Sequence, residues 1–473
     1  MSKLADEERS TSGDYHSDLI SEIILWEDEH AIHRFSYKNI PVWRLIRTEY
    51  IRRYLVNNNA RTSNNFNQQT AKEYLAFFLN SVLSILQILK LSSRANLILG
   101  FPRKQKYKGR WIDSFFDPLM DWMGRENALY FDKPFNARHY IDRSNGKVVN
   151  FEIVRLAGGI GKIVFRIKSL LGKSELGDSR EVELIASRFG KTKQEVVDDI
   201  LATYHGFLYE YRLAKYILNV VNPRNLLFVN RWVNFSFIAA ARDLGVRPIE
   251  LQHGAVGKHS FQYLTKYDTR VDPVYFLAFG EFWKNFDWGI PDENVVPIGH
   301  RYIGLRRGQP GQGTGKAVML TSKPPRWREL DRIYSQVVKE NPDTQFILKL
   351  HPQDVQGWEN RYKVGLACNV HVIDDPTQDL YEIFSSCQAV IGDDSTLLYE
   401  ASFFGLKVGL LNEDGNNPCE AIRYVGSYNF FEIKAVADVK EMLASKRFGE
   451  VDEGNPFFSE FKGDLLRNML FEG

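Results

Sequence analysis

Short apolar runs that alternate with helical patterns constrain the fold more than any other feature of this sequence. Residues 346–412 show this best, because the runs FILK, VHVI, AVIG and VGLL are each followed by polar residues. Strands separated by helices predict a parallel sheet, and ligands collect at the carboxyl ends of such strands. The candidate ligand-binding residues at these ends are Lys349, His351, Asp393, Asp394, Ser395 and Thr396.

The alternation occurs twice, so the sequence predicts two α/β domains of the Rossmann-like kind. A Gly-, Gln- and Pro-rich segment separates the two series, as expected of an interdomain linker. The predicted divisions are a disordered tail (1–17), an N-terminal domain with helical insertions (18–305), the linker (306–316), a C-terminal domain (317–450) and a C-terminal helix that packs back on the N-terminal domain (451–473).

Composition narrows the class of protein. A chain of 473 residues with 44% hydrophobic content is long enough for more than one core. A formal charge of +2 gives no basic field, so we expect no nucleic-acid partner. The three cysteines lack metal-site or redox-pair spacing, and the N-terminus lacks the apolar core of a signal peptide. We expect a cytoplasmic protein without a metal or other cofactor.

Two helical segments leave membrane contact open. Residues 74–91 are the most apolar of the chain, but Asn80, Ser84 and Gln87 draw a polar stripe down the predicted helix. This pattern favours a buried or interfacial amphipathic helix over a membrane span. The GGIG run at residues 158–161 lies inside a basic amphipathic pattern, and no acidic ribose partner follows it. We interpret it as a surface or membrane-facing helix and not as a dinucleotide loop.

The segment GDDSTLLYEA is predicted to bind phosphate. An apolar strand leads into Gly392, and acids and hydroxyls then occupy the first turn of a helix. The free N–H groups and positive dipole end of a helix N-terminus suit a phosphate, and Ser395 and Thr396 add hydroxyl donors. Asp394 or Ser395 could also simply cap the helix, and the two roles can coexist. Glu400, one turn further on, is expected to reach a ribose hydroxyl.

Two histidines follow predicted strands. His351 in KLHP can donate to a leaving phosphate, and Lys349 shares its side of the strand. His253 in LQHG precedes Gly254, which permits close backbone approach, and a neutral imidazole there would serve as a general base. The alternatives are an ordinary hydrogen-bonded strand-end histidine at His351 and a loop-fixing histidine at His253.

Further candidates lie in loops after strands, which often carry function. The basic and aromatic loop PRKQKYKGRWIDSFFDPLMD is either an acceptor site, with Asp113 and Asp117 as carboxylates, or a solvated surface loop. Glu281 is a third candidate carboxylate. The remaining donor-side candidates are Thr321, Ser322, Lys323, Asp374 and Asp375.

Three motifs in this order, LQHGAVG at His253, KLHP at His351 and GDDST at Ser395, resemble bacterial glycosyltransferases and polyol-phosphate transferases of the GT-B fold. That group includes Kdo transferases, HP-motif sialyltransferases and teichoic-acid-type transferases that build capsules and lipopolysaccharide. The resemblance covers roughly residues 225–412 and implies two Rossmann-like domains facing each other across a cleft. It implies that His351, Ser395 and Thr396 hold the donor phosphate, that Asp374, Asp375 and Pro376 lie near the base, and that His253 lies by the reacting centre.

The resemblance also implies an activity. We expect a metal-independent glycosyltransferase that moves a Kdo-like or sialic-like sugar from a CMP-activated donor to a surface polysaccharide or glycolipid. An alternative is CDP-polyol phosphotransfer, but Gln252 stands where teichoic-acid-type enzymes usually have Trp, and GDDST replaces a TDYSS-like segment. A further alternative is a non-catalytic nucleotide- or glycan-binding scaffold. Peripheral contact with the inner membrane and with polysaccharide-assembly proteins would accompany these activities.

Overall fold

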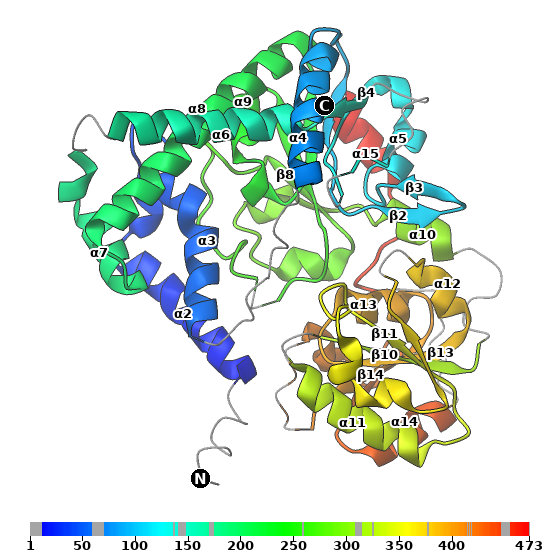
Figure 1. Cartoon of the computed structure of the whole chain (residues 1–473). Helices are drawn as coiled ribbons and strands as arrows, with labels where there is room; N and C mark the ends of the chain where they lie inside the picture. Colours follow the sequence, from blue (N-terminus) through cyan, green and yellow to red (C-terminus); the bar gives the residue numbers. More distant parts are fainter. Residues whose placement is uncertain are drawn as a thin grey trace.

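The computed structural model describes residues 12–58, 71–135, 138–140, 148–169, 175–257, 260–307, 315–323, 326–375, 378–413, 415, 417, 419–445 and 455–472. Within these residues the chain forms two α/β domains, each built on one parallel sheet (Figure 1). This confirms the predicted fold class. A two-stranded hairpin, β2 (Gln105–Tyr107) and β3 (Arg110–Ile112), extends the loop after the first strand.

The N-terminal sheet has seven parallel strands in the order β5-β4-β1-β6-β7-β8-β9. These strands are β1 (Asn96–Leu99), β4 (Ala128–Asp132), β5 (Val148–Asn150), β6 (Asn225–Val229), β7 (Arg247–Leu251), β8 (Tyr275–Ala278) and β9 (Val295–Pro297). Strand β5 is an edge strand, and the sequence did not predict β4 or β5.

Helices cover both faces of this sheet, so its central strands are apolar on both sides. Leu97 and Leu99 of β1 share one core with α8 and α9, whereas Ile98 points into the core formed with α5 and α15. The helices are α8 (Lys193–Val221), α9 (Phe235–Asp243), α5 (Asp117–Met123) and α15 (Gly463–Arg467). The C-terminal helix α15 thus belongs to the core of the N-terminal domain.

Extra helices extend the N-terminal domain away from the sheet (Figure 1). They are α2 (Ser12–Glu29), α3 (Val42–Asn57) and α7 (Arg180–Phe189), which pack with one end of α8 around a shared apolar cluster. Inside this layer, Arg47 pairs with Glu27 at 2.5 Å and Trp43 donates to the same carboxylate. The tail prediction is wrong for residues 12–17, which are helical, and its other residues lie outside the described ranges.

The C-terminal sheet has six parallel strands in the order β12-β11-β10-β13-β14-β15. They are β10 (Ala317–Thr321), β11 (Phe346–Lys349), β12 (Val370–Ile373), β13 (Cys387–Gly392), β14 (Lys407–Leu411) and β15 (Phe430–Ile433). Helices α11 (Trp327–Glu340) and α14 (Val436–Ala444) cover one face. Helices α12 (Leu380–Ser385) and α13 (Thr396–Phe403) cover the other face and meet the N-terminal domain.

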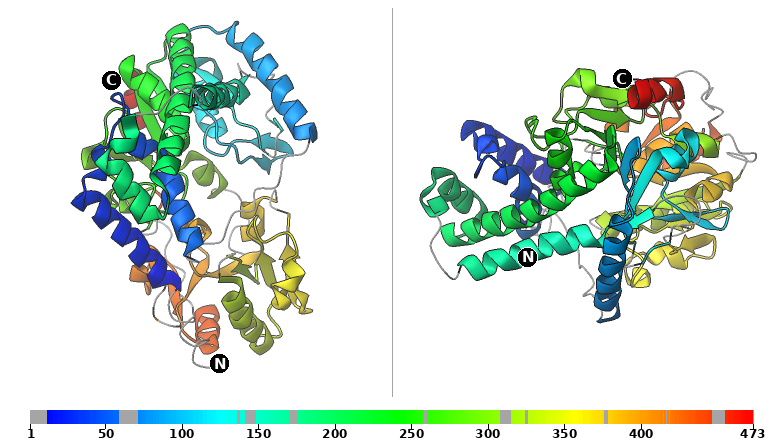
Figure 2. Two further views of the ribbon diagram at one scale, coloured as in Figure 1. Left: turned by 60° about the vertical axis from the view of Figure 1, so that its left-hand side comes forward. Right: turned by 90° about the horizontal axis from the view of Figure 1, so that it is seen from above.

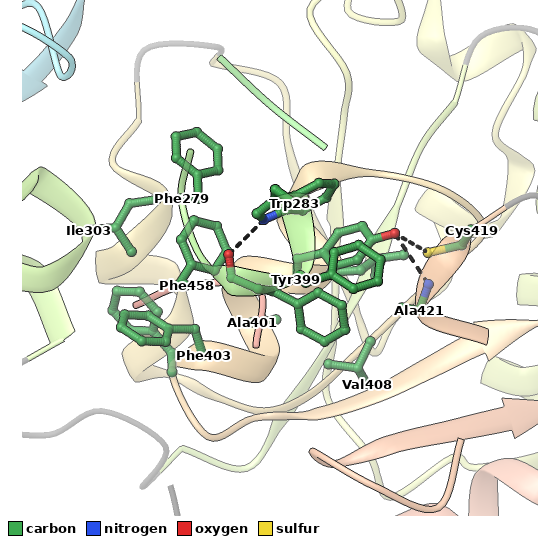
Figure 3. Close-up of a cluster of buried hydrophobic side chains, with 14 of the residues drawn as sticks. Phe279, Trp283, Ile303, Tyr399, Ala401, Phe403, Val408, Cys419, Ala421 and Phe458 are labelled. Carbon is green, nitrogen blue, oxygen red and sulfur yellow. Dashed lines mark hydrogen bonds between the residues drawn. The ribbon is translucent and has the colours of Figure 1, made fainter. Parts of the chain in front are cut away.

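A mixed core joins the two domains (Figure 3). Trp283 and Ile303 from the N-terminal domain pack in the same cluster as Tyr399 and Phe403 of α13. The returning C-terminal segment completes it, because Trp283 donates its indole N–H to the carbonyl of Phe457 at 2.7 Å. Burial of these apolar side chains stabilises the contact between the two domains.

Two further sequence predictions can be compared with the structure. The GGIG run lies in a helix, α6 (Glu152–Ser169), and a Cβ at Gly161 would collide with the backbone of His205 in α8. These glycines therefore serve helix packing. The predicted linker begins too early, because α10 (Arg301–Arg307) continues to Arg307, and residues 308–314 lie outside the described ranges.

Candidate active site

The loop after β7 and the N-terminus of α13 meet where the two domains join. The backbone N–H of Ala255 donates to the Thr396 hydroxyl at 2.8 Å. A Cβ at Gly254 would lie 2.9 Å from the same hydroxyl oxygen, so glycine permits this approach. Two motifs that are more than a hundred residues apart in the sequence therefore form one site.

Two hydrogen bonds in series, through Tyr263 to Glu250, hold the His253 ring in place. Its Nδ1 lies 3.1 Å from the Tyr263 hydroxyl, which donates to Glu250 Oε1 at 3.4 Å. Because the phenol proton is given to Glu250, the imidazole donates from Nδ1 and its Nε2 keeps a lone pair. Burial lowers the pKa of His253 to about 4, so the ring is neutral at physiological pH. A neutral ring with an unprotonated Nε2 can accept a proton.

Buried charged side chains fix this hydrogen-bonded series at its Glu250 end. Arg231 donates from Nε to Glu250 Oε2 at 2.6 Å and from its backbone N–H to Oε1 at 3.0 Å. Arg231 also lies 3.5 Å from Asp272, which pairs with Arg44 at 2.6 Å. The Arg231, Glu250 and Asp272 side chains are fully buried. Such a network fixes the position of the histidine because each charge would be costly to leave unpaired.

On the opposite side, the GDDST segment combines helix capping with a set of donors. Ser395 is the N-cap of α13, and its Oγ accepts from the Leu397 N–H at 3.3 Å. The capping alternative is therefore realised, while the hydroxyl proton of Ser395 remains available to an acceptor. Gly392 permits close strand packing, since a Cβ there would collide with the Thr321 hydroxyl.

The acids of this segment hold cations of the loop after β10. Buried Asp393 accepts from Lys323 at 3.1 Å and from Arg326 at 2.5 Å, and Asp394 lies 3.4 Å from Lys323. Burial opposes the charged form of Lys323, but Asp394 and Asp393 together raise its pKa above the ordinary value. Lys323 is thus an ion-paired part of the site and not a lone cation facing the ligand.

The KLHP segment contributes a second imidazole, whose Nε2 is a hydrogen-bond donor where that of His253 is an acceptor. The His351 backbone N–H donates to Ser322 Oγ at 2.6 Å, which joins the loops after β10 and β11. The Gln353 N–H donates to His351 Nδ1 at 3.2 Å, so the neutral ring carries its proton on Nε2. His351 is exposed and therefore presents an N–H donor to a ligand.

Arg103 is a site residue that the sequence reasoning missed. It lies in the loop after β1, yet its positive charge acts on Lys349, His351 and Glu400 of the other domain. Burial lowers the pKa of Lys349, and Arg103 lowers it further. Arg103, Lys349 and His351 are thus electrostatically coupled across the two domains. The signal was present in the basic loop PRKQKYKGR, but the candidates chosen from it were acids.

Glu400 and the loop after β12 border this donor set. Burial raises the pKa of Glu400 to about 7, and its Oε2 accepts from the Tyr381 hydroxyl at 3.0 Å. Asp374 and Asp375 are exposed, and the Asp375 carbonyl accepts from Lys349 Nζ at 3.2 Å. Pro376 lies outside the described residues. Glu400 therefore offers a protonatable group and the loop offers backbone and carboxylate acceptors.

The three candidate carboxylates of the N-terminal domain have structural partners. Buried Asp113 accepts from the Phe101 N–H at 2.7 Å and from the Tyr130 hydroxyl at 2.8 Å. Asp117 accepts from the Asp113 N–H at 2.7 Å, and burial raises its pKa. Glu281 is exposed and pairs with Lys462 at 2.9 Å. Loop folding accounts for the two aspartates, and Glu281 contacts the C-terminal segment.

Among the described residues there is no group of three or more His, Cys, Asp or Glu side chains arranged to hold a metal ion. The site does contain imidazoles, hydroxyls, guanidinium and ammonium groups, and the carboxylates of Asp393 and Asp394 are paired with Lys323 and Arg326. Such a set can bind phosphate and stabilise negative charge directly.

No protein-family model matches the chain, and no curated protein matches it. Among solved structures, UDP-GlcNAc 2-epimerase from Methanocaldococcus jannaschii is 10% identical, with a TM-score of 0.47 over 80% of this chain and 99% of that chain. The Neisseria meningitidis UDP-GlcNAc 2-epimerase bound to UDP-GlcNAc is 12% identical, with a TM-score of 0.47 over the same shares. The wall teichoic acid polymerase TagF is 11% identical, with a TM-score of 0.42 over 85% and 98%. At these values the likeness supports no conclusion about substrate or activity.

Proposed function

We propose that the protein is a glycosyltransferase that moves a sugar from a CMP-activated donor to a glycan or glycolipid acceptor. One observation carries the proposal: the Ala255 to Thr396 hydrogen bond brings the His253 loop against the N-terminus of α13. This contact supports a site in which a neutral imidazole base would act beside a set of phosphate-binding donors. A transferase needs both, and a simple binding protein has no use for the base.

The donor phosphate would be held on the C-terminal side of this site. The Ser395 hydroxyl and the His351 Nε2–H are hydrogen-bond donors, the N-terminus of α13 adds its positive dipole end, and Arg103 adds a guanidinium from the other domain. Charge-assisted hydrogen bonds of this kind strengthen as negative charge grows on the leaving phosphate. We propose a Kdo-like or sialic-like donor sugar, with Lys349 available to its carboxylate.

The acceptor hydroxyl would lie against His253. As the hydroxyl oxygen attacks the anomeric carbon, its proton moves to His253 Nε2 and the bond from that carbon to the phosphate oxygen breaks. CMP leaves with the bonding electron pair, and the imidazolium later returns its proton to solvent. Glu250 and Tyr263 hold the ring through this step but do not touch the substrate.

A nucleotide panel followed by product analysis tests the proposal. Calorimetric titration with CMP, CDP, UDP, GDP and ADP should show tightest binding for a cytidine nucleotide. Turnover with CMP-sugars should then release CMP while the acceptor gains a sugar without phosphorus. A clear preference for UDP or GDP contradicts the donor assignment, and tight nucleotide binding without any turnover favours a non-catalytic scaffold.

CDP-polyol phosphotransfer is the second candidate, favoured by the nearby charges of Arg103 and Lys349, which suit a diphosphate. In this reaction the acceptor oxygen attacks the distal phosphorus, CMP leaves, and the acceptor gains a phosphodiester. Phosphorus NMR of the isolated acceptor separates the two candidates, because only phosphotransfer adds a phosphodiester signal.

A further inference from the structure

Helix α4 (Ala71–Ile88) is oriented with its polar stripe toward the protein. Gln87 Oε1 accepts from the backbone N–H of Asn150 at 2.8 Å, and the Asn150 amide donates to Asn80 Oδ1 at 3.3 Å. The hydroxyls of Ser81 and Ser84 are buried and bond to carbonyls of their own helix. The polar side chains of α4 are therefore used in docking the helix to the edge strand β5.

The apolar side chains of α4 consequently face outward. A helix on a water-facing surface normally buries its apolar stripe and exposes its polar one, the reverse of what is seen here. Leu89, just after the helix, is 70% exposed, and Leu79 and Leu86 are 58% and 54% exposed. The exposed row consists of Leu75, Phe78, Leu79, Val82, Ile85, Leu86 and Leu89.

Helix α6 continues this apolar surface. It contacts α4, and its Gly158 and Gly161 pack against α8, so that its opposite side faces outward. Ile160, Ile163 and Ile167 are exposed on that outward side. Seen from above, α6 lies along the outer side of α8 and α4 stands beside one end of α6 (Figure 2, right). The α4–α6 surface is thus a continuous, convex apolar region formed by two helices.

Basic side chains flank the α4–α6 surface. Lys72 and Lys90 are exposed at the ends of α4, and Arg155 and Lys162 are exposed on α6. The carboxylates of the two helices are Glu73 and Glu152, and Glu152 is buried against His139 at 2.7 Å. An apolar stripe with a basic margin is complementary to an anionic bilayer, whose headgroups are negative and whose interior is apolar.

We propose that the α4–α6 surface binds an anionic lipid bilayer, with both helices lying in the plane of the interface. The aliphatic side chains would enter the boundary between headgroups and acyl chains, and the flanking lysines and Arg155 would contact anionic headgroups. No helix among the described residues is long and apolar enough to cross a membrane. A protein partner suits the surface less well, because protein interfaces centre on aromatic and Arg anchors and the exposed row is almost wholly aliphatic.

Vesicle sedimentation with the full chain tests this proposal without relying on enzymatic activity. Wild-type protein should sediment with vesicles of phosphatidylcholine and phosphatidylglycerol, and less with phosphatidylcholine alone. The double variant Leu79→Glu/Leu86→Glu should lose at least ~10-fold in partition coefficient, because charged groups replace two inserted side chains. The double variant Lys90→Glu/Lys162→Glu should lose the preference for anionic vesicles while keeping residual binding.

A matched control uses exposed leucines elsewhere. Leu25 in α2 and Leu366 in the C-terminal domain are 61% and 64% exposed, so Leu25→Glu/Leu366→Glu introduces the same charges at comparable exposure. This control should bind vesicles as wild type does. Equal binding by Leu79→Glu/Leu86→Glu, or none by wild type, overturns the proposal. The proposal is also overturned if the wild-type protein forms a dimer without lipid and Leu79→Glu/Leu86→Glu converts that dimer to a monomer. The surface would then serve self-association.

Discussion

The two histidines of the site are held in opposite ways. His253 is backed by Tyr263, Glu250 and Arg231, a chain of buried groups that leaves Nε2 as an acceptor. His351 lies exposed in a loop, and a backbone N–H on Nδ1 leaves its Nε2–H as a donor. A base gains from burial because burial keeps it neutral, whereas a group that meets a phosphate must reach a charged, solvated ligand. In the proposed reaction, one residue type would thus perform two tasks because of its surroundings.

The largest expected effect is a loss of kcat, and it distinguishes the base role of His253 from the phosphate-binding role of His351. His253→Ala should lower kcat by ~10³-fold, because a general base is lost, while leaving nucleotide affinity unchanged. His351→Ala should lower both kcat and nucleotide affinity. Steady-state kinetics and calorimetric titration measure the two quantities. If His253→Ala weakened nucleotide binding and His351→Ala did not, the assigned roles would be reversed.

The next largest effect is a difference in the free energy of unfolding between variants on the two sides of the site. Glu250→Gln should lower the free energy of unfolding by about 3–5 kcal/mol, because the buried Arg231 loses the carboxylate at 2.6 Å and keeps only the more distant Asp272 at 3.5 Å. Asp394→Asn is the control on the other side, and it should cost less than ~1 kcal/mol because Asp394 is 34% exposed and Lys323 keeps Asp393. Urea unfolding compares the variants. Equal losses of unfolding free energy in the two variants would show that the buried Arg231–Glu250 network is not the rigid part of the site.

A smaller effect tests whether both domains bind the donor. Arg103→Ala should weaken nucleotide binding by ~10-fold, since one charge-assisted contact from the N-terminal domain is removed. Arg103→Lys should restore part of the affinity. Arg110→Ala in the neighbouring hairpin strand β3 is the control and should bind normally. Unchanged affinity in Arg103→Ala would confine donor binding to the C-terminal domain.

The smallest effect is a shift in pH dependence. Burial lowers the pKa of His253 from 6.5 to about 4, so kcat/KM should fall only near pH 4 on the acid side. Between pH 6.5 and 4 the unfolded chain binds a proton that the folded His253 does not bind, so stability falls as the pH falls through this window. His253→Gln should remove that part of the fall. Glu400→Gln removes the titration of Glu400, whose pKa is about 7, from the pH profile of kcat/KM. An acid limb near pH 6.5 that persists in Glu400→Gln would contradict a buried neutral base.

The sequence predicted the positions of candidate residues that depend on local pattern. Period was enough to place His253, His351 and Ser395 just after strands, where the structure also has them. Arg103 was missed because its place opposite Lys349 depends on how the domains pack, which no local pattern encodes.

Burial explains two other differences between prediction and structure. Asp113 was a reasonable catalytic candidate by residue type, but its oxygens are occupied by Phe101 and Tyr130 after folding. The polar stripe of α4 was found from its spacing, yet spacing does not say which stripe faces the protein. That choice depends on Asn150 of the edge strand β5, a three-residue strand that the sequence did not predict.

The crossing of the C-terminal segment has a mechanical consequence. The chain passes from one domain to the other after α10 and returns before Phe457, so two covalent connections join the domains. The Phe457 ring packs against Phe282 of the N-terminal domain and Tyr399 of the C-terminal domain, with centroid distances of 4.7 and 4.9 Å. The ring therefore touches both domains at once, and separating them would expose it to water. Its burial favours the arrangement in which the His253 loop meets the N-terminus of α13.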